Sequence, residues 1–474
     1  MNFSRLEKPR SDSTQSSGSG TFDPFSRSTQ PPIAVSEDGD ATELGRAKRK
    51  FKMLIDKEIA NTIVDPRAYA DPQRIDAAFA TLRVEAPFAQ AQPDGFSKFW
   101  VASRHADILE IERQPQVFAN GAGPTNLIPR ESHDFVVGLT GEQNLIRSLV
   151  TLDGDEHKSL RALLFPAMTP RAVRDYEQLI RGIAEQYVED MIERGPECDF
   201  ARETAFHYPL RVIMTLLGIP PEDEAHLLRL TQQMFGNADP DLNRAGAELT
   251  RAEITASLIQ VMADLEEYFD DVTRRYRAEP THAINSVIAN AKLNGQYLNR
   301  RQLMGYFIIA ATAGHDTTAN TTASAMWALA ERPNLFARLK SDPNALPAFV
   351  EESIRWATPV KTFMRTAIAN GEIRGQVVNK GDWVLLSYHS ANRDEEVFDD
   401  PFEFRIDRNP NRQIAFGSGP HVCLGQHLAR LELRAFWECL LARLDSIELA
   451  GKPALMHSNF VVGPKSVPIR FTAQ

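Results

Sequence analysis

The feature that most constrains this chain is the loop Phe416-Gly-Ser-Gly-Pro-His-Val-Cys-Leu-Gly425, which runs directly into an amphipathic helical pattern. Its three glycines allow a tight turn and let the backbone approach a flat partner closely. Cys423 stands at the start of the predicted helix, where the helix dipole and free N–H groups favour the thiolate. We therefore expect the pKa of this thiol to be low, and a thiolate is the form that acts as a nucleophile or as a soft ligand to iron.

Composition excludes several classes of protein. With 53 Lys and Arg against 63 Asp and Glu, the net charge of −10 disfavours binding to nucleic acid or to anionic lipid. The three cysteines have no CxxC spacing, so they indicate neither a disulfide framework nor a zinc site. No run approaches the roughly 18 uncharged apolar residues that span a bilayer, and the N-terminus lacks an apolar signal core. We predict a cytoplasmic protein that binds no nucleic acid and no membrane.

The chain divides into a tail and one helix-rich unit. Residues 1–40 are rich in Ser, Thr, Gly, Pro and Gln, a composition that predicts a disordered tail. Residues 41–474 show no repeat and no flexible linker, so we predict a single domain that is mainly α with a small β region. Strand patterns concentrate at residues 84–103 and 362–388. In the second region Asn370-Gly371 and Asn379-Lys380-Gly381 predict hairpin turns.

A second constraint is the long segment from Arg301 to Glu331, which we predict to be one helix that Pro333 ends. Small residues recur on it at i, i+4, i+7 and i+11, and they are Ala310, Gly314, Thr317 and Thr321. This spacing puts them on one helix face. A bulky group can therefore approach that face closely.

The spacing Phe-x-x-Gly-x-x-x-Cys-x-Gly would arise by chance in about 5 of 10,000 chains of this composition. On this motif the sequence resembles the cytochrome P450 superfamily of haem-thiolate monooxygenases. The resemblance implies a fold in which haem b lies between the central helix and the cysteine loop. It makes Cys423 the axial ligand of the haem iron and puts Phe416 and Gly425 at the cofactor. Strings such as Val360-Lys-Thr-Phe-Met-Arg-Thr-Ala and Asn459-Phe-Val-Val-Gly-Pro-Lys are similar to the bacterial soluble terpineol hydroxylase subfamily.

The run Ala313-Gly314-His315-Asp316-Thr317 fits the central-helix pattern of that family. An Asp-Thr-Thr run alone is more often a helix kink or a solvated face. Within the resemblance, Gly314 binds the cofactor and Asp316 and Thr317 are catalytic. A hydroxyl holds the bound oxygen there, and a carboxylate relays protons to it.

A structural network is implied by Glu352-Ser-Ile-Arg355 and by Arg408. An acid three residues before a base is expected about 7 times in this chain by chance, so only its position between the central helix and the cysteine loop gives it weight. The resemblance makes Glu352, Arg355 and Arg408 a scaffold that fixes the loop.

Haem propionates need cationic or hydrogen-bonding partners. The resemblance assigns this role to His157, Arg161, Arg365 and His421. His157 and Arg161 are four residues apart on a predicted helix, so both can face one propionate.

The implied function is hydroxylation of a small apolar cyclic substrate, a terpenoid or an alkyl-aromatic compound, with O2 and externally supplied electrons. No G-x-G-x-x-G fingerprint and no P-loop is present, so we expect ferredoxin and ferredoxin reductase as partners. The expected substrate pocket is Ile309, Ala313, Val360, Phe460 and Val461. Two alternatives stay open: a peroxide-driven peroxygenase on the same fold, which the Asp316–Thr317 pair disfavours, and a non-catalytic haem sensor or carrier.

Overall fold

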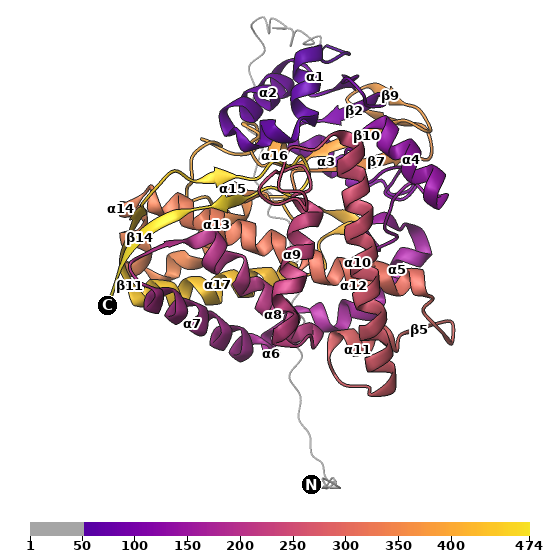
Figure 1. Cartoon of the computed structure of the whole chain (residues 1–474). Helices are drawn as coiled ribbons and strands as arrows, with labels where there is room; N and C mark the ends of the chain where they lie inside the picture. Colours follow the sequence, from indigo (N-terminus) through magenta and orange to yellow (C-terminus); the bar gives the residue numbers. More distant parts are fainter. Residues whose placement is uncertain (1–51) are drawn as a thin grey trace, which may run out of the picture. The chain divides into compact units, whose positions relative to one another are not determined.

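The computed structural model describes residues 52–474, which Figure 1 colours along the sequence. The predicted tail, residues 1–40, lies outside the described residues. The helices of the described part are α1 Lys57–Val64, α2 Pro72–Glu85, α3 His105–Glu112, α4 Arg130–Thr140, α5 Gly154–Leu164, α6 Pro170–Asp175, α7 Glu177–Arg194, α8 His207–Leu217, α9 Glu224–Phe235, α10 Arg251–Ala278, α11 Ile284–Ala289, α12 Arg300–Ala313, α13 Asp316–Ala330, α14 Pro333–Ser341, α15 Leu346–Ala357, α16 Tyr388–Ala391 and α17 Gln426–Arg443. The predicted fold class, mainly α with a small β region, is confirmed.

The largest sheet has five strands in the order β1-β2-β10-β7-β3. Its strands are β1 Phe88–Ala91, β2 Phe99–Ala102, β3 Phe118–Ala119, β7 Thr362–Ala367 and β10 Trp383–Ser387. The β2–β10 pair is parallel and the other pairs are antiparallel. Four of these strands fall in the two regions where the sequence predicts strands, so local β propensity and pattern were sufficient there.

Smaller sheets complete the β structure. A three-stranded sheet joins β11 Leu444–Leu449, β14 Pro468–Ala473 and β4 Glu197–Asp199, and hairpins pair β5 Lys292–Leu293 with β6 Gln296–Tyr297, β8 Gly371–Ile373 with β9 Gln376–Val378, and β12 Ala454–Leu455 with β13 Pro464–Ser466. Neither predicted turn closes a hairpin, although Asn379-Lys380-Gly381 does form a turn, with the Asp382 N–H donating to the Asn379 carbonyl at 3.0 Å. The β8–β9 turn is Arg374-Gly375, both at positive φ, whereas Asn370 and Lys380 are bonded to each other where the hairpin leaves the main sheet.

The largest hydrophobic core gathers residues of α7, α8, α12, α13, α15 and α17. In Figure 1, α7 and α17 lie side by side, and the main sheet lies with α1 and α2 at the top of the view. The predicted apolar face of α17 is buried at Leu428, Leu431 and Ala435. Helix α12 starts at a capping box between Asn299 and Gln302. The core thus fixes the helices that carry the central segment and the cysteine loop.

The central segment is not one helix. It breaks at Gly314 and His315, where His315 has φ −107° and ψ −69°, and it resumes as α13. Threonine hydroxyls on both sides donate to carbonyls four residues back, Thr312 to Ile308 at 2.7 Å and Thr317 to Ala313 at 3.1 Å. Such bonds compete with the helical ladder and bend helices, which the apolar periodicity does not reveal.

Candidate active site

The face of the central segment that carries the small residues is incompletely buried, although the segment runs through the core. Ile309, Ala310, Gly314 and Thr317 are partly exposed and Ala313 is exposed, whereas Ala311, Thr312 and Thr318 on the other face are buried. A Cβ at Gly314 would lie 2.9 Å from the side chain of Ile213 in α8, so only glycine permits this packing. The small-residue face is therefore open on one side and tightly packed on the other.

The cysteine loop is held by its own backbone and by its neighbours. The Cys423 N–H donates to the Phe416 carbonyl at 2.8 Å, and Arg161 of α5 donates to the Val422 carbonyl at 2.6 Å. Gly419 has a φ of +67°, and a Cβ there would lie 2.4 Å from the carbonyl oxygen of Glu112 in α3. The loop is thus clamped between α3 and α5.

The Cys423 side chain is partly exposed at the start of α17, whose N-cap is Gly425. Burial raises the pKa of the thiol, and the N–H groups of Gly425 and Gln426 together with Arg161 only partly offset this. The expected low pKa was therefore wrong for the protein alone. The predicted N–H groups are present, but removal from water outweighs them.

Helix α5 joins the loop to the central segment. Its Arg161 binds the loop at Val422, and the preceding residue, Leu160, accepts a hydrogen bond from the Tyr306 hydroxyl of α12. His157, one turn before Arg161, stacks on His421 of the loop with ring centroids 4.2 Å apart. The small-residue face and the loop are thus connected through one helix.

Of the four residues predicted to bind propionates, three lie together at α5 and the loop. The His157 Nε2 atom is buried and has no hydrogen-bond partner in the described part of the chain. Burial and the neighbouring His421 and Arg161 lower the pKa of His157 to about 4. His421 lies 3.5 Å from the Asp153 carboxylate. The neutral ring of His157 therefore has a free polar atom directed at no protein group.

Arg365, the fourth, is buried on β7 and has a partner that sequence reasoning missed. Its Nη2 donates to Glu112 Oε1 at 3.3 Å, and the same oxygen accepts from the Tyr388 hydroxyl at 2.6 Å. Burial raises the pKa of Glu112, against the effect of Arg365 and Tyr388. Glu112 is more than 250 positions from both Arg365 and Tyr388 in the sequence, so no local pattern could have linked it to them.

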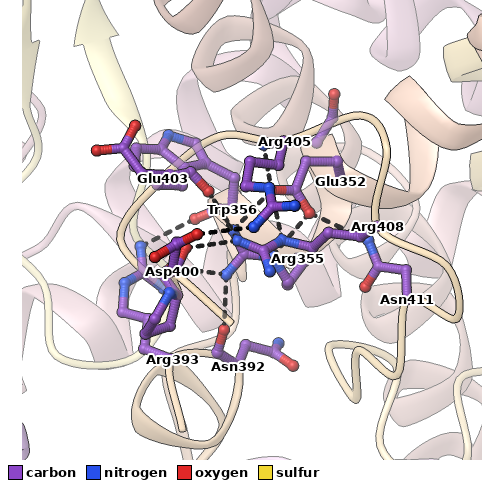
Figure 2. Close-up of polar contacts among 12 residues, drawn as sticks. Glu352, Arg355, Trp356, Asn392, Arg393, Asp400, Glu403, Arg405, Arg408 and Asn411 are labelled. Atoms are coloured by element: carbon purple, nitrogen blue, oxygen red, sulfur yellow. Dashed lines mark hydrogen bonds and ion pairs between the residues drawn. The ribbon is translucent and has the colours of Figure 1, made fainter. Parts of the chain in front are cut away.

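Figure 2 shows the Glu352–Arg355–Arg408 cluster, in which Glu352 and Arg355 are fully bonded, while Arg393 and Asn411 at its edge keep buried polar atoms without hydrogen-bond partners in the described structure. Glu352 and Arg355 are both 0% exposed. All five N–H groups of Arg355 donate, two to Glu352 and the others to the carbonyls of Asn392, Pro401 and Glu403. Arg408 Nε donates to Glu352 at 3.1 Å. The Asn392 side chain in turn accepts from Ile414 N–H just before the cysteine loop, so the network reaches that loop.

Three aromatic rings from distant segments meet near the predicted pocket residues. The Phe460 ring lies 6.1 Å from that of Phe235 at the end of α9 and 5.3 Å from that of Phe363 on β7. Val360 and Val461 form a β-bridge, which joins two predicted pocket residues, although Val461 is buried. Sequence reasoning missed Phe235 and Phe363 because nothing local marks their convergence on Phe460.

The late loop also touches the central segment. Gly463 approaches α13 so closely that a Cβ there would lie 2.3 Å from the Asn320 side chain. On the other side, Thr231, one helical turn before Phe235 on α9, lies 3.4 Å from His315. The aromatic cluster is therefore connected to the break in the central segment from two directions.

Comparison with known proteins decides the family. The cytochrome P450 family model matches residues 128–471. The chain belongs to the cytochrome P450 family. It is 43% identical to cytochrome P450-terp of a Pseudomonas species. The 423 aligned residues are 89% of this chain and 99% of that protein. The predicted family is confirmed, and the chain is a cytochrome P450 monooxygenase, an oxidoreductase that uses a haem-thiolate centre.

Two further relatives agree. Linalool 8-monooxygenase of Pseudomonas putida is 34% identical over 394 residues, which are 82% of this chain and 94% of that protein. The crystal structure of CYP108D1 from Novosphingobium aromaticivorans superposes with a TM-score of 0.81 at 40% identity, covering 89% of this chain and 100% of that one. Among the described helices, none is long and apolar enough to cross a membrane.

Proposed function

We propose that Cys423 is the axial ligand of a haem b iron. The observation that carries this proposal is a partly exposed cysteine on a clamped loop in a chain of the cytochrome P450 family. A thiol that coordinates a metal ion is deprotonated outright, which overcomes the effect of burial on the pKa of Cys423. Phe416, Gly425 and Gly314 are proposed to contact the faces of the cofactor.

The donor set around the loop supports binding of the two propionates. The buried, unpartnered Nε2 of His157 would be satisfied by a carboxylate oxygen; His421 and Arg161 lie beside it at the loop, and Arg365 is a further cation on β7. We assign the scaffold role to Glu352, Arg355 and Arg408, because their saturated bonds lead to the loop through Asn392. These roles belong to one catalytic domain, residues 41–474.

When bound, the haem activates dioxygen and transfers one oxygen atom to a C–H bond. The chain supplies the protons. The Thr317 hydroxyl donates to Ala313 at 3.1 Å and keeps lone pairs free to accept another bond. The neighbouring Asp316 is buried, and its Oδ2 receives no hydrogen bond from a described residue, although His315 Nδ1 lies 3.3 Å from it. We propose that Asp316 passes protons to the oxygen held by Thr317, a role that a sensor or a peroxide-driven enzyme does not need.

The substrate we propose is a small apolar cyclic compound, such as a monoterpene alcohol or an alkylbenzene. Ile309, Ala313 and Val360 offer apolar, partly exposed surface, and the ring of Phe460 stands among other aromatic rings. Such walls stabilise a ligand by burial at about 25 cal/mol per Å² and offer no partner for a carboxylate. One relative is named linalool 8-monooxygenase, which supports a terpenoid substrate, whereas relatives at 32% identity are named methyl-branched lipid omega-hydroxylase and steroid C26-monooxygenase.

Electrons are proposed to come from a ferredoxin and its reductase, with the ferredoxin docking near Cys423. Turnover with a surrogate ferredoxin system and O2 tests this, because a peroxygenase works only with peroxide and a sensor works with neither.

The substrate class is tested by titrating the holoenzyme with terpenoids, alkylbenzenes, fatty acids and steroids and recording the low-to-high-spin shift. We expect the tightest binding and turnover with the small cyclic compounds. Phe460→Ala is expected to weaken their binding, whereas Phe165→Ala, at an exposed surface position, serves as the matched control. Binding of only a long-chain acid or a steroid contradicts the proposal.

A further inference from the structure

His315, at the break between α12 and α13, is a buried histidine to which the proposed mechanism gives no task. It is 0% exposed, and the side chain of the adjacent Asp316 is 5% exposed. The His315 Nε2 atom lies 2.8 Å from the Phe206 carbonyl oxygen. The Nδ1 atom lies 3.3 Å from Asp316 Oδ2 and 3.4 Å from the Thr231 hydroxyl.

Two of these neighbours can only accept, and the third, the Thr231 hydroxyl, can accept from or donate to Nδ1. A carbonyl oxygen and a carboxylate oxygen only accept hydrogen bonds. The Thr231 hydroxyl donates to the Leu228 carbonyl at 3.1 Å, so its lone pairs are left for Nδ1. Both ring nitrogens of His315 therefore face acceptors, which suits the doubly protonated imidazolium. A ring without a proton on Nδ1 would set a lone pair 3.3 Å from Asp316 Oδ2, a buried oxygen to which no described group donates a hydrogen bond.

The groups around His315 also favour its protonated form. Burial lowers the pKa of His315, but Asp316, the Phe206 carbonyl and Glu224 of α9 more than offset this, so the pKa is raised above its ordinary value. Glu224 is itself bound by Arg211 of α8, and the last turn of α12 carries no charge. Asp316 is the first residue of α13, where the helix dipole favours a carboxylate.

We propose that His315 and Asp316 share one buried proton, and that His315 is a positioning residue that holds the Asp316 carboxylate and supplies it with a proton. This rests on the proposed relay from Asp316 to Thr317. In the transfer, the N–H bond at Nδ1 breaks and an O–H bond forms at Asp316 Oδ2. The imidazolium becomes neutral imidazole and the carboxylate becomes a carboxylic acid, so the pair is neutral before and after. The proton transfer from His315 to Asp316 therefore leaves the net charge of the buried core unchanged.

The first test is ¹⁵N NMR of histidine-labelled holoenzyme in its diamagnetic ferrous–carbonyl form. We expect one histidine to be an imidazolium at pH 7 to 8 and to become neutral in Asp316→Asn. His105 is the matched control, because it is also buried and has its Nε2 2.8 Å from a carbonyl, that of Arg412, while burial lowers its pKa. A neutral His315 in the native protein at pH 6 overturns the proposal, whether or not the relay to Thr317 exists.

The second test is kinetic. His315→Gln is expected to slow turnover about tenfold, to divert reductant to peroxide and to raise the solvent isotope effect. In the Asp316→Asn background it should add little, because His315 acts through Asp316. His105→Gln should keep native turnover. Additive losses with an unchanged isotope effect would show that His315 is only structural. The ferrous–carbonyl spectrum distinguishes a structural role of His315 from failure of haem-thiolate ligation. Native turnover and coupling in both Asp316→Asn and Thr317→Ala would instead reject the proton relay itself.

Discussion

Two buried polar regions of this protein differ in how completely their groups are bonded. In the network of Figure 2, both Glu352 oxygens and all five N–H groups of Arg355 have partners. At the break of the central segment, Asp316 Oδ2 has His315 Nδ1 at 3.3 Å but receives no hydrogen bond, and both polar atoms of Asn320 are buried without partners in the described structure. The fully bonded Glu352–Arg355 pair is held in one geometry, whereas the Asp316 carboxylate, with few bonds, is free to accept a proton. We therefore assign a structural role to the network of Figure 2 and a catalytic role to the break of the central segment.

Breaking the Glu352–Arg355 pair should give the largest effect. Arg355→Met leaves Glu352 buried beside fewer donors, so we expect a loss of about 3–5 kcal/mol in the free energy of unfolding. Chemical denaturation of the holoenzyme measures it. Arg405→Met is the matched control, since the Arg405 side chain pairs only with the exposed Asp400 and Asp407, and should lose less than about 1 kcal/mol. Equal losses of unfolding free energy in the two variants would contradict the distinction between the buried network and the exposed ion pairs.

A buried lysine, Lys361, lies close to Arg393, one of the residues of Figure 2. Lys361 donates to the carbonyl of Ala357, the last residue of α15, and burial together with the nearby Arg393 lowers its pKa to about 7. Between pH 7 and 10.5 the folded protein has lost this proton while the unfolded chain keeps it, so this residue makes stability rise with pH. We expect Lys361→Met to remove a rise of about 4 kcal/mol over that range. Denaturant unfolding at several pH values measures it, and the exposed Lys158→Met should leave the pH profile unchanged.

Variants at the break should affect rate rather than stability. We expect Asp316→Asn to slow turnover about 100-fold and Thr317→Ala to divert reductant to peroxide, while both keep haem and substrate binding. Turnover, peroxide yield and unfolding measured on the same samples check this. Native rate and coupling in both variants would show that the protons come from elsewhere.

A smaller effect is expected at the edge of the cofactor site. Arg161→Ala and Arg365→Ala each remove a charge-assisted hydrogen bond to a propionate, worth about 1.5–3 kcal/mol of haem binding. Transfer of haem to an acceptor protein measures the loss. The exposed Arg171→Ala is the control, and retention equal to that of the native protein would contradict the assignment.

The sequence predicted the features that are local. The β regions 84–103 and 362–388, helix α5 with His157 and Arg161, and the start of α17 after Cys423 are all read from short-range patterns. The break at His315 was not predictable from the apolar periodicity, because that pattern does not show the threonine hydroxyl bonds to the backbone on either side of it or the contact of His315 with Phe206, 109 positions away.

Long-range contacts account for the rest. Glu112 was overlooked because its partners Arg365 and Tyr388 come close only in the fold, as do Phe235 and Phe363 around Phe460. The pKa of Cys423 was misjudged for a related reason. The helix start is visible in the sequence, but the burial that opposes it is a property of the packed chain.

The central claim is that Cys423 ligates the haem iron, and the absorption spectrum of the reduced protein under carbon monoxide tests it most directly. Thiolate ligation predicts a strongly red-shifted Soret band in the native protein and in Cys198→Ser and Cys439→Ser, and its loss in Cys423→His. An unshifted Soret band in the native holoenzyme would contradict the account.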